Sequence, residues 1–284
     1  MANLLDHGAL ALLHRSGMTS RWVQTGEGRI HVLDGKGRGD LPTVLLFHGL
    51  SSRATHFRRL INRLLPHVRR VVVPDLLGHG LSEVPAGGAD GPMAVRAMDE
   101  VIGQIIDEPF VVYGNSMGGY GALKFAARFP GRALGVVVTS PGGAVMPPGA
   151  FAGFLERFRL TTHDDALAFL PRIFSRPVPF VLLRHAVAWA VRRQLNRPSN
   201  VAFIATLNEE DSLRPEELAR LVGPALMMWG TTERLFPREH FEYFRGALPA
   251  HVLIEEPEGY GHLAYLERTE HLADRIVGFM RTFA

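Results

Sequence analysis

Short runs rich in leucine and β-branched residues alternate along the chain with longer segments in which apolar residues recur every three or four positions. The runs, each of four to seven residues and bounded by turn residues, are 43–47, 70–74, 110–113, 133–139, 225–229 and 251–255. Continuous apolar runs of this length are typical of strands that are buried on both faces of a sheet. They predict the central strands of a mostly parallel sheet.

The intervening segments have helical periodicity, as in the first of them, where Phe57, Leu60, Ile61, Leu64 and Leu65 share one side of a helix. The predicted helices are 55–66, 93–106, 119–129, 238–248 and 263–283. Alternating strands and helices indicate an α/β protein with helices flanking the sheet. Two further runs, 21–25 and 29–33, joined by the turn Gly26-Glu27-Gly28, predict an antiparallel hairpin at the edge, giving eight strands in all.

The alternation breaks once, between residues 146 and 214. This segment opens with Met146-Pro147-Pro148-Gly149, contains helix-like stretches but no convincing strand, and holds seven of the 17 phenylalanines. It predicts a helical lid subdomain, 146–214, inserted after the sixth strand of a core formed by 1–145 and 215–284. Its aromatic rings either pack a small core of their own or line an apolar pocket, and both can hold at once.

Composition narrows the function classes. The chain has no cysteine, which excludes disulfides, thiolate chemistry and cysteine metal sites and fits a reducing compartment. Residues 1–19 make a poor signal peptide, and the longest apolar segment, 180–191, is interrupted by Arg184 and His185 and falls short of the roughly 20 residues that span a bilayer. We therefore expect a cytoplasmic protein with no membrane span.

Charge and histidine spacing give no further partner. The net charge is +3, without a dense basic run, so nucleic-acid binding is not expected. The histidines are scattered without ligand spacing, so we expect neither a metal nor another cofactor. Nothing in the pattern indicates an oligomeric state.

One turn between a predicted strand and a predicted helix carries chemistry. Gly114-Asn115-Ser116-Met117-Gly118 matches the motif G-x-S-x-G and follows the strand 110–113 directly. In such a turn the serine takes a strained backbone conformation, and its hydroxyl projects at the carboxyl end of the sheet, next to the start of a helix. The alternative is a serine that only caps that helix.

A serine hydroxyl needs a base, and the base needs a carboxylate that orients it. Two later loops supply them. Glu233 follows the strand 225–229, and His262 follows the strand 251–255. Serine, acid and histidine thus occur in the chain order of an α/β hydrolase. Asp211 is a more distant alternative for the acid.

Four landmarks in order, each after a strand, carry a resemblance to the α/β-hydrolase superfamily over residues 20–284. They are His48-Gly49, the loop from Pro74 and Asp75 through His79 to Ser82, the Ser116 turn, and Gly261-His262. The resemblance implies an α/β-hydrolase fold with Ser116 as nucleophile, His262 as general base and Glu233 as orienting acid. At the acid position the superfamily usually has aspartate.

The resemblance also implies how the site is completed. The oxyanion hole would be formed by the backbone amides of Leu50 and Met117, whose side chains, with that of Leu263, would contact the substrate. His48 would support the oxyanion loop, and Asp75 and His79 would shape a tight loop without touching the substrate.

The nucleophile limits the reaction. Haloalkane dehalogenases and epoxide hydrolases of this superfamily use an aspartate where this chain has Ser116, so acyl transfer to water through an acyl-enzyme is expected. The Phe-rich segment favours a small-molecule carboxylic ester or thioester with an apolar acyl or alcohol group of small to medium size.

Asn115 supports an alternative, because the sequence Gly-Asn-Ser-Met-Gly-Gly is similar to the carbon–carbon bond hydrolases that act on ring-fission products. Against it, those enzymes carry a glycine-rich run where this chain has Leu50 to Arg53, and tryptophan where it has Leu263. They also bind an acidic substrate through a lid arginine, for which Arg184, Arg192 and Arg193 are available. Cofactor-free perhydrolysis and ligand binding with little turnover are further possibilities.

Overall fold

The computed structural model describes residues 4–283; residues 1–3 and 284, the two ends of the predicted core, lie outside the described residues. Its sheet has eight strands in the order β1-β2-β4-β3-β5-β6-β7-β8. The strands are β1 Met18–Thr25, β2 Gly28–Lys36, β3 Thr43–Phe47, β4 Arg70–Pro74, β5 Phe110–Asn115, β6 Gly135–Thr139, β7 Ala225–Met228 and β8 Leu253–Glu255.

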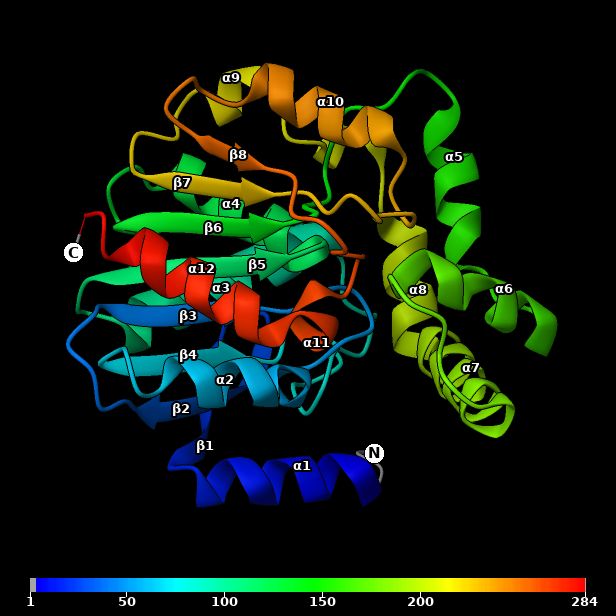
Figure 1. Cartoon of the computed structure of the whole chain (residues 1–284), viewed down its shortest axis with the longest axis horizontal. Helices are drawn as coiled ribbons and strands as arrows, with labels where there is room; N and C mark the ends of the chain where they lie inside the picture. Colours follow the sequence, from blue (N-terminus) through cyan, green and yellow to red (C-terminus); the bar gives the residue numbers. More distant parts are fainter. Residues whose placement is uncertain (1–3, 284) are drawn as a thin grey trace.

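Strands β3 to β8 all run parallel to one another, and β2 is antiparallel to both of its neighbours, β1 and β4. The β1–β2 hairpin pairs Thr25 with Gly28, so its loop is Gly26 and Glu27. The predicted mostly parallel, eight-stranded sheet is therefore confirmed. Because the parallel strands point the same way, the loops that follow them meet at one edge of the sheet, on the right in Figure 1.

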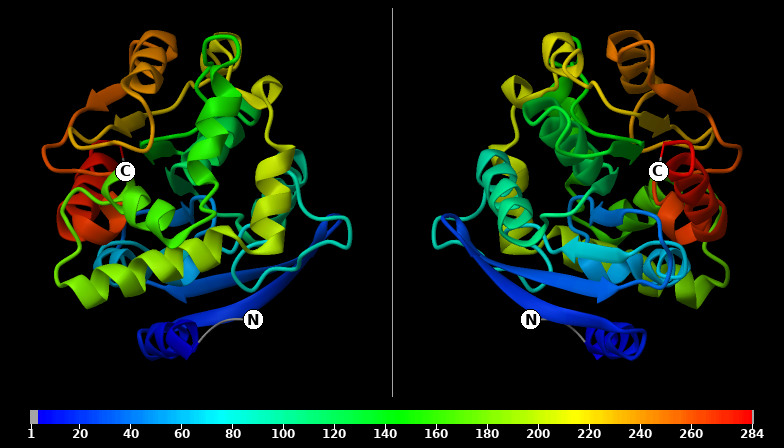
Figure 2. Two further views of the ribbon diagram at one scale, coloured as in Figure 1. Left: turned by 90° about the vertical axis from the view of Figure 1, so that its right-hand side faces the viewer. Right: turned by 90° about the vertical axis from the view of Figure 1, so that its left-hand side faces the viewer.

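Helices cover both faces of this sheet (Figures 1 and 2). One face packs against α1 Leu4–Arg15, α2 Arg58–Leu64, α11 Ala264–Glu267 and α12 Thr269–Met280. The other packs against α3 Gly91–Ile105, α4 Met117–Arg128 and α10 Arg238–Ala247. Helix α1 was not predicted; Leu13, which is fully buried, joins it to the α2 side of the core.

The segment between β6 and β7 forms α5 Ala150–Leu155, α6 His163–Ile173, α7 Val181–Leu195 and α8 Pro198–Thr206, before α9 Pro215–Leu218 returns to the core. These four helices lie beyond the carboxyl ends of the parallel strands (Figures 1 and 2). We refer to residues 146–214 as the insertion. Its treatment as a separate subdomain stays a prediction.

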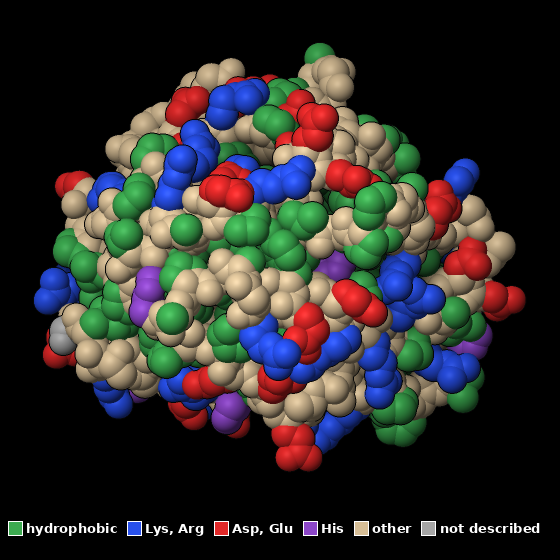
Figure 3. All heavy atoms as spheres, turned by 90° about the horizontal axis from the view of Figure 1, so that it is seen from above, with side chains coloured by type: hydrophobic (Ala, Val, Ile, Leu, Met, Phe, Trp, Pro, Cys, Tyr) green, Lys and Arg blue, Asp and Glu red, His purple; other side chains and the backbone are tan. Residues whose placement is uncertain are grey.

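The face above α10 carries acidic and basic side chains side by side (Figure 3). Two of them, Arg238 and Arg245, both form ion pairs with Glu242.

Among residues 4–283 no helix is both long and apolar enough to cross a membrane.

Candidate active site

Ser116 stands alone between a strand and a helix. β5 ends at Asn115, α4 begins at Met117, and Ser116 itself has φ 57° and ψ −123°, a conformation that a residue with a Cβ rarely adopts. Its side chain makes no capping hydrogen bond to α4. The hydroxyl is therefore not committed to the helix, as it would be if the serine served only as a cap.

The turn is possible because its flanking glycines have no side chain. A Cβ on Gly114 would lie 2.1 Å from the carbonyl oxygen of Gly118, and a Cβ on Gly118 would lie 2.1 Å from the carbonyl oxygen of Phe47. Both distances are far below van der Waals contact. Only glycine at these two positions allows the helix to start so close behind the sheet.

The loops after β7 and β8 bring Glu233 and His262 together. His262 Nδ1 lies 2.9 Å from Glu233 Oε2, and the side chains are only 4% and 1% exposed. Glu233 Oε1 accepts hydrogen bonds from the amides of Leu235 and Phe236. The carboxylate is thus held by its own loop at one oxygen and faces the imidazole with the other.

Backbone contacts fix these two loops to each other and to the Ser116 turn. Thr232 donates from both its amide and its hydroxyl to the carbonyl oxygen of Tyr260. Asn115 donates from its side-chain amide to the carbonyl oxygens of Thr139 and His262. Since both acceptors are carbonyls, the NH2 group of Asn115 must face them. Asn115 therefore positions the histidine loop and is turned away from any ligand.

Glu233 is ionised in this environment. Burial alone would raise the pKa of its carboxyl, but the charge and hydrogen bond of His262, together with hydrogen bonds from Ser140 and Phe236, outweigh it and lower that pKa below its ordinary value. The histidine therefore faces a permanent negative charge at neutral pH.

Asp211, the alternative acid, lies elsewhere. Its carboxylate accepts a hydrogen bond from Asn208 at 2.9 Å, and its own amide donates to the side chain of Asn208. No hydrogen bond joins it to His262 in the part of the chain that the structure describes. Of the two carboxylates that the sequence offered, the structure brings Glu233 to the histidine.

Two backbone amides next to Ser116 are free to donate. Within residues 4–283, the N–H groups of Leu50 and Met117 have no acceptor in the protein. The Gly49–Leu50 peptide passes close to the serine, since a Cβ on Gly49 would lie 3.6 Å from Ser116 Oγ. Met117 is the first residue of α4, whose amino end carries a partial positive charge.

His48 orients the backbone amide of Leu50. Burial, aided by nearby His79, lowers the pKa of His48 to about 3, so its ring is neutral. Nε2 accepts from the amide of Leu76 at 3.0 Å, so the proton is on Nδ1, which donates to the carbonyl oxygen of Gly49 at 2.9 Å. In a trans peptide the N–H points opposite to the carbonyl. By holding the Gly49 carbonyl, His48 therefore turns the Leu50 N–H the other way.

Asp75 and His79 shape the neighbouring loop. The carboxylate of Asp75 accepts from the amides of Ala54 and Leu81 and from the ring of His31. His79 Nδ1 donates to the carbonyl oxygen of Leu77. These contacts lie within the protein framework, as the sequence suggested for this loop.

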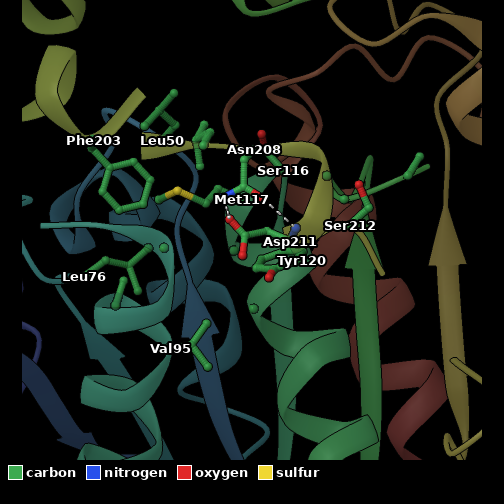
Figure 4. A pocket seen from close by; sticks show the side chains of 18 of the residues that line it. Leu50, Leu76, Val95, Ser116, Met117, Tyr120, Phe203, Asn208, Asp211 and Ser212 are labelled. Carbon is green, nitrogen blue, oxygen red and sulfur yellow. Dashed lines mark hydrogen bonds between the residues drawn. The ribbon is translucent and has the colours of Figure 1, made fainter. Parts of the chain in front are cut away.

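An apolar cavity of about 150 Å³ opens onto Ser116. The insertion lines it with Met146, Phe151, Phe154, Leu155, Phe158, Phe203 and Leu207, and the core with Leu50, Leu76, Val95, Met98, Met117 and Tyr120. Figure 4 shows Leu50, Met117 and Phe203 around the serine. Four of the seven phenylalanines of the insertion thus face this cavity, whereas Phe169 is buried in the hydrophobic core and Phe180 is exposed to solvent.

The charged side chains that line the cavity are acidic. Asp99 and Asp211 lie on its wall, and no lysine or arginine lines it among residues 4–283. Burial raises the pKa of both carboxyls above the ordinary value of an aspartate. Since Asp99 forms an ion pair with Arg128, Asp211 is the carboxylate that would repel a negatively charged ligand, and no lysine or arginine among the described lining residues would attract one.

Some predicted contacts are absent. Leu263 does not line the cavity; its amide donates to the carbonyl oxygen of Ile173, which ties the histidine loop to the insertion. Arg184 and Arg193 are exposed, and Arg192 donates to the carbonyl oxygens of Leu160 and Thr161. None of these three arginines reaches the cavity, because α7 packs outside the helices that line it.

Two aromatic residues near the site were missed by the sequence analysis. Phe236 meets the ring of His262 edge-on at 4.9 Å, and His240 stacks on Phe236 at 5.1 Å. Burial lowers the pKa of His240 to about 4, so it is neutral. Only their place in the loop and helix after β7 could have suggested them. Among the described residues, no three His, Asp or Glu side chains are grouped so that they could hold a metal ion.

Comparison with known proteins gives matches over most of the chain. A family model described as "alpha/beta hydrolase fold" matches residues 42–269. Haloalkane dehalogenase 2 of Mycobacterium tuberculosis is 26% identical and is aligned over 91% of this chain and 93% of its own. The 2-hydroxy-6-oxononadienedioate/2-hydroxy-6-oxononatrienedioate hydrolase of Escherichia coli is 28% identical over 78% and 82%.

Among solved structures, carboxylesterase CesB of Bacillus subtilis superposes with a TM-score of 0.71 at 22% identity, covering 98% of this chain and 97% of the other. At that identity the likeness concerns the fold alone.

Proposed function

Because the chain belongs to the alpha/beta hydrolase family, we propose that it is a serine hydrolase that cleaves a neutral carboxylic ester or thioester with an apolar acyl or alcohol group. The observation that carries this proposal is the contact of 2.9 Å between His262 Nδ1 and Glu233 Oε2 in the loops beside the strained Ser116 turn. The pair supplies a base, His262, and a carboxylate that orients this base, Glu233, beside the serine that lines the cavity.

In the proposed reaction, Ser116 Oγ attacks the carbonyl carbon while His262 Nε2 takes the hydroxyl proton. Glu233 holds the Nδ1–H tautomer and stabilises the imidazolium that forms. His262 then gives the proton to the leaving alcohol or thiol, which leaves an acyl-Ser116. A water molecule, deprotonated by His262, hydrolyses that ester and regenerates the serine.

The amides of Leu50 and Met117 are proposed to bind the oxyanion of each tetrahedral intermediate. Both donors lie next to Ser116 and have no acceptor in the described protein, so they are available without breaking an internal hydrogen bond. His48 is a positioning residue for the Leu50 donor, acting through the Gly49 carbonyl.

His48→Phe should lower kcat by about 10- to 100-fold with little change in KM, because losing a whole oxyanion donor costs about 100- to 1000-fold and this variant only misorients one. The measurement is steady-state hydrolysis of a nitrophenyl ester. His79→Phe is the matched control: a buried histidine of similar surroundings that does not contact Gly49. Equal kcat values for the two variants would show that His48 does not position the Leu50 amide for catalysis.

The cavity defines the proposed substrate class. Phenylalanine rings from the insertion and methionine and leucine side chains from the core surround the space above Ser116. Among residues 4–283, the charged side chains on its wall are the carboxylates of Asp99 and Asp211. An uncharged, apolar substrate gains burial there, whereas an anionic one would be repelled. We propose that the insertion acts as a lid over this space.

Substrates that differ only in charge test this. The enzyme should hydrolyse 4-nitrophenyl butyrate with a kcat/KM at least about 100-fold above that for 4-nitrophenyl hemisuccinate, whose chain is of similar length but ends in a carboxylate. Asp211→Asn should lower the ratio of the kcat/KM values for the two esters. The control is Glu210→Gln, which should leave that ratio unchanged, because Glu210 is exposed and does not line the cavity. Equal rates for the two esters would contradict the proposed selectivity.

A second candidate is carbon–carbon bond hydrolysis, which the relative from Escherichia coli and the residue Asn115 favour. Two observations weigh against it here. The side-chain amide of Asn115 donates its hydrogen bonds to the carbonyl oxygens of Thr139 and His262. Within the described residues, no arginine lines the cavity to bind an acidic substrate. A ring-fission dienoate assayed beside the esters and an acyl-thioester distinguishes the candidates by their kcat/KM.

Haloalkane dehalogenation, the activity in the name of the relative from Mycobacterium tuberculosis, is not proposed. That reaction, as these enzymes perform it, needs a carboxylate at the position of Ser116. Ligand binding with little turnover remains the alternative of another class, and it predicts a serine that does not react.

A further inference from the structure

Helix α7 turns an apolar face to solvent. Leu182, Leu183, Ala186, Trp189 and Ala190 recur at helical spacing on one side of the helix, and all of them are exposed. Leu182 is 86% exposed and Trp189 55%. The buried residues of α7, Ala188 and Leu195, lie on the other side. On the surface of a water-soluble protein, the exposed side of a helix normally carries polar and charged side chains.

The residue before the helix extends this face. Phe180 is 81% exposed and has φ 61°, a conformation that is strained for an aromatic residue. Val181, at the first position of α7, is 67% exposed. The chain therefore enters α7 with a strained backbone and with its bulky apolar side chains in solvent, which costs free energy unless something covers them.

The surrounding charge is of one sign. Residues 166–208 contain six arginines and not one aspartate or glutamate, although the whole chain has a net charge of only +3. Arg176 and Arg184 flank Phe180, are exposed, and form no ion pair within the described residues. Arg193 stacks on Trp189 at 5.2 Å and belongs to the same side of α7. The face above α10, where both signs alternate, is the contrast within this protein.

We propose that this α7 face, formed by Arg176, Phe180, Leu182, Leu183, Trp189 and Arg193, docks on the surface of an anionic phospholipid bilayer. Leucine, phenylalanine and tryptophan side chains enter the headgroup region, and arginines pair with the phosphates. The helix lies in the interface and does not span it. Helix α8 follows α7 in the chain and lies beside it (Figure 2). Because α8 lines the cavity with Phe203, docking of α7 brings the cavity close to the bilayer.

A second copy of the chain fits the α7 face less well than an anionic bilayer does. A two-fold contact would place the same patch on both sides and bring arginines against arginines, with no acidic side chain in residues 166–208 to pair with them. Anionic headgroups supply the missing negative charge at any point of the surface. The docking does not depend on the proposed function, and its test uses no catalytic readout.

The full chain should co-sediment with vesicles of phosphatidylcholine that contain about 30% phosphatidylglycerol, at least about tenfold more strongly than with phosphatidylcholine alone. Raising the salt to about 0.5 M should release most of it. Leu182→Ser combined with Arg193→Gln should weaken binding by about tenfold or more. The matched control, Val222→Ser with Arg220→Gln, removes an exposed apolar residue and an exposed arginine outside residues 166–208, and should bind like wild type.

Brominated lipids add a direct readout of position, because they quench a tryptophan only when it enters the bilayer. Quenching should disappear in Trp189→Phe and persist in Trp22→Phe, with circular dichroism used to verify that each variant is folded. Failure to bind the anionic vesicles, or equal loss of binding in the test and control pairs, would overturn the proposal. It would also be overturned if sedimentation velocity showed a wild-type dimer that does not bind the vesicles and that Leu182→Ser with Arg193→Gln converts to a monomer.

Discussion

Ser116→Ala should lower kcat by about 10⁴- to 10⁶-fold while the protein remains folded. The hydroxyl is proposed to form the acyl-enzyme, and alanine has no atom that can do so. Serine and alanine share the same unbranched Cβ, so the strained conformation at φ 57° costs about the same in both. The Ser116 side chain makes no capping hydrogen bond to α4 whose loss would destabilise the helix. Steady-state hydrolysis of 4-nitrophenyl butyrate gives kcat, and thermal unfolding verifies the fold.

A second serine in the same cavity is the control. Ser212 is also buried and lines the cavity, but its backbone is unstrained, with φ −60° and ψ 146°, and it lies outside the turn that Asn115 joins to the His262 loop. Ser212→Ala should keep kcat within about threefold of wild type. Substantial turnover by Ser116→Ala, or a collapse of turnover in Ser212→Ala, would mean that the wrong serine was assigned.

Glu233→Gln should lower kcat by about 10²- to 10⁴-fold. Glutamine has nearly the same shape, and its oxygen can still accept the amides of Leu235 and Phe236. Its NH2 group then faces His262 Nδ1 and favours the tautomer that carries the proton on Nε2, which cannot accept a proton from the serine. If the amide flips instead, an NH2 group meets two N–H donors and both loop hydrogen bonds are lost. In this flipped orientation the amide oxygen still accepts from His262 Nδ1–H, but it carries no negative charge to stabilise the imidazolium, so both orientations should lower kcat.

Glu233 itself should not titrate between pH 6 and 8, since its pKa lies below its ordinary value, so protonation of this carboxylate should make no contribution to the wild-type pH profile in that range. Asp211→Asn makes the same change of carboxylate to amide in the cavity wall, away from His262. On a neutral ester it should retain activity within a few-fold of wild type. A silent Glu233→Gln together with an inactive Asp211→Asn would reverse the assignment of the acid.

Much of the fold could be predicted because its signals are local. The strand 43–47 has the predicted bounds, and the strand 110–113 extends only to Asn115, since apolar runs between turn residues define a buried parallel strand directly. The order of Ser116, Glu233 and His262 along the chain was enough to place three side chains at the carboxyl edge of one sheet, because every parallel strand ends there.

The remaining features depend on packing between distant segments, which no local pattern encodes. Leu263 was expected to touch the substrate from its place after the histidine, but its amide is bonded to Ile173 of the insertion. Asn115 suggested a reaction, but its contacts across the sheet give it a framework role. The apolar segment 180–191 has the composition of a buried helix, and only the structure shows that Leu182 and Trp189 face outward.

If Ser116 is an activated nucleophile, a fluorophosphonate should label it covalently. Intact-mass and peptide analysis should show one phosphonyl group per wild-type chain, attached to Ser116, with labelling abolished in Ser116→Ala and strongly slowed in Glu233→Gln. A folded wild-type protein that takes up no label, or takes it up at another serine, would contradict the account.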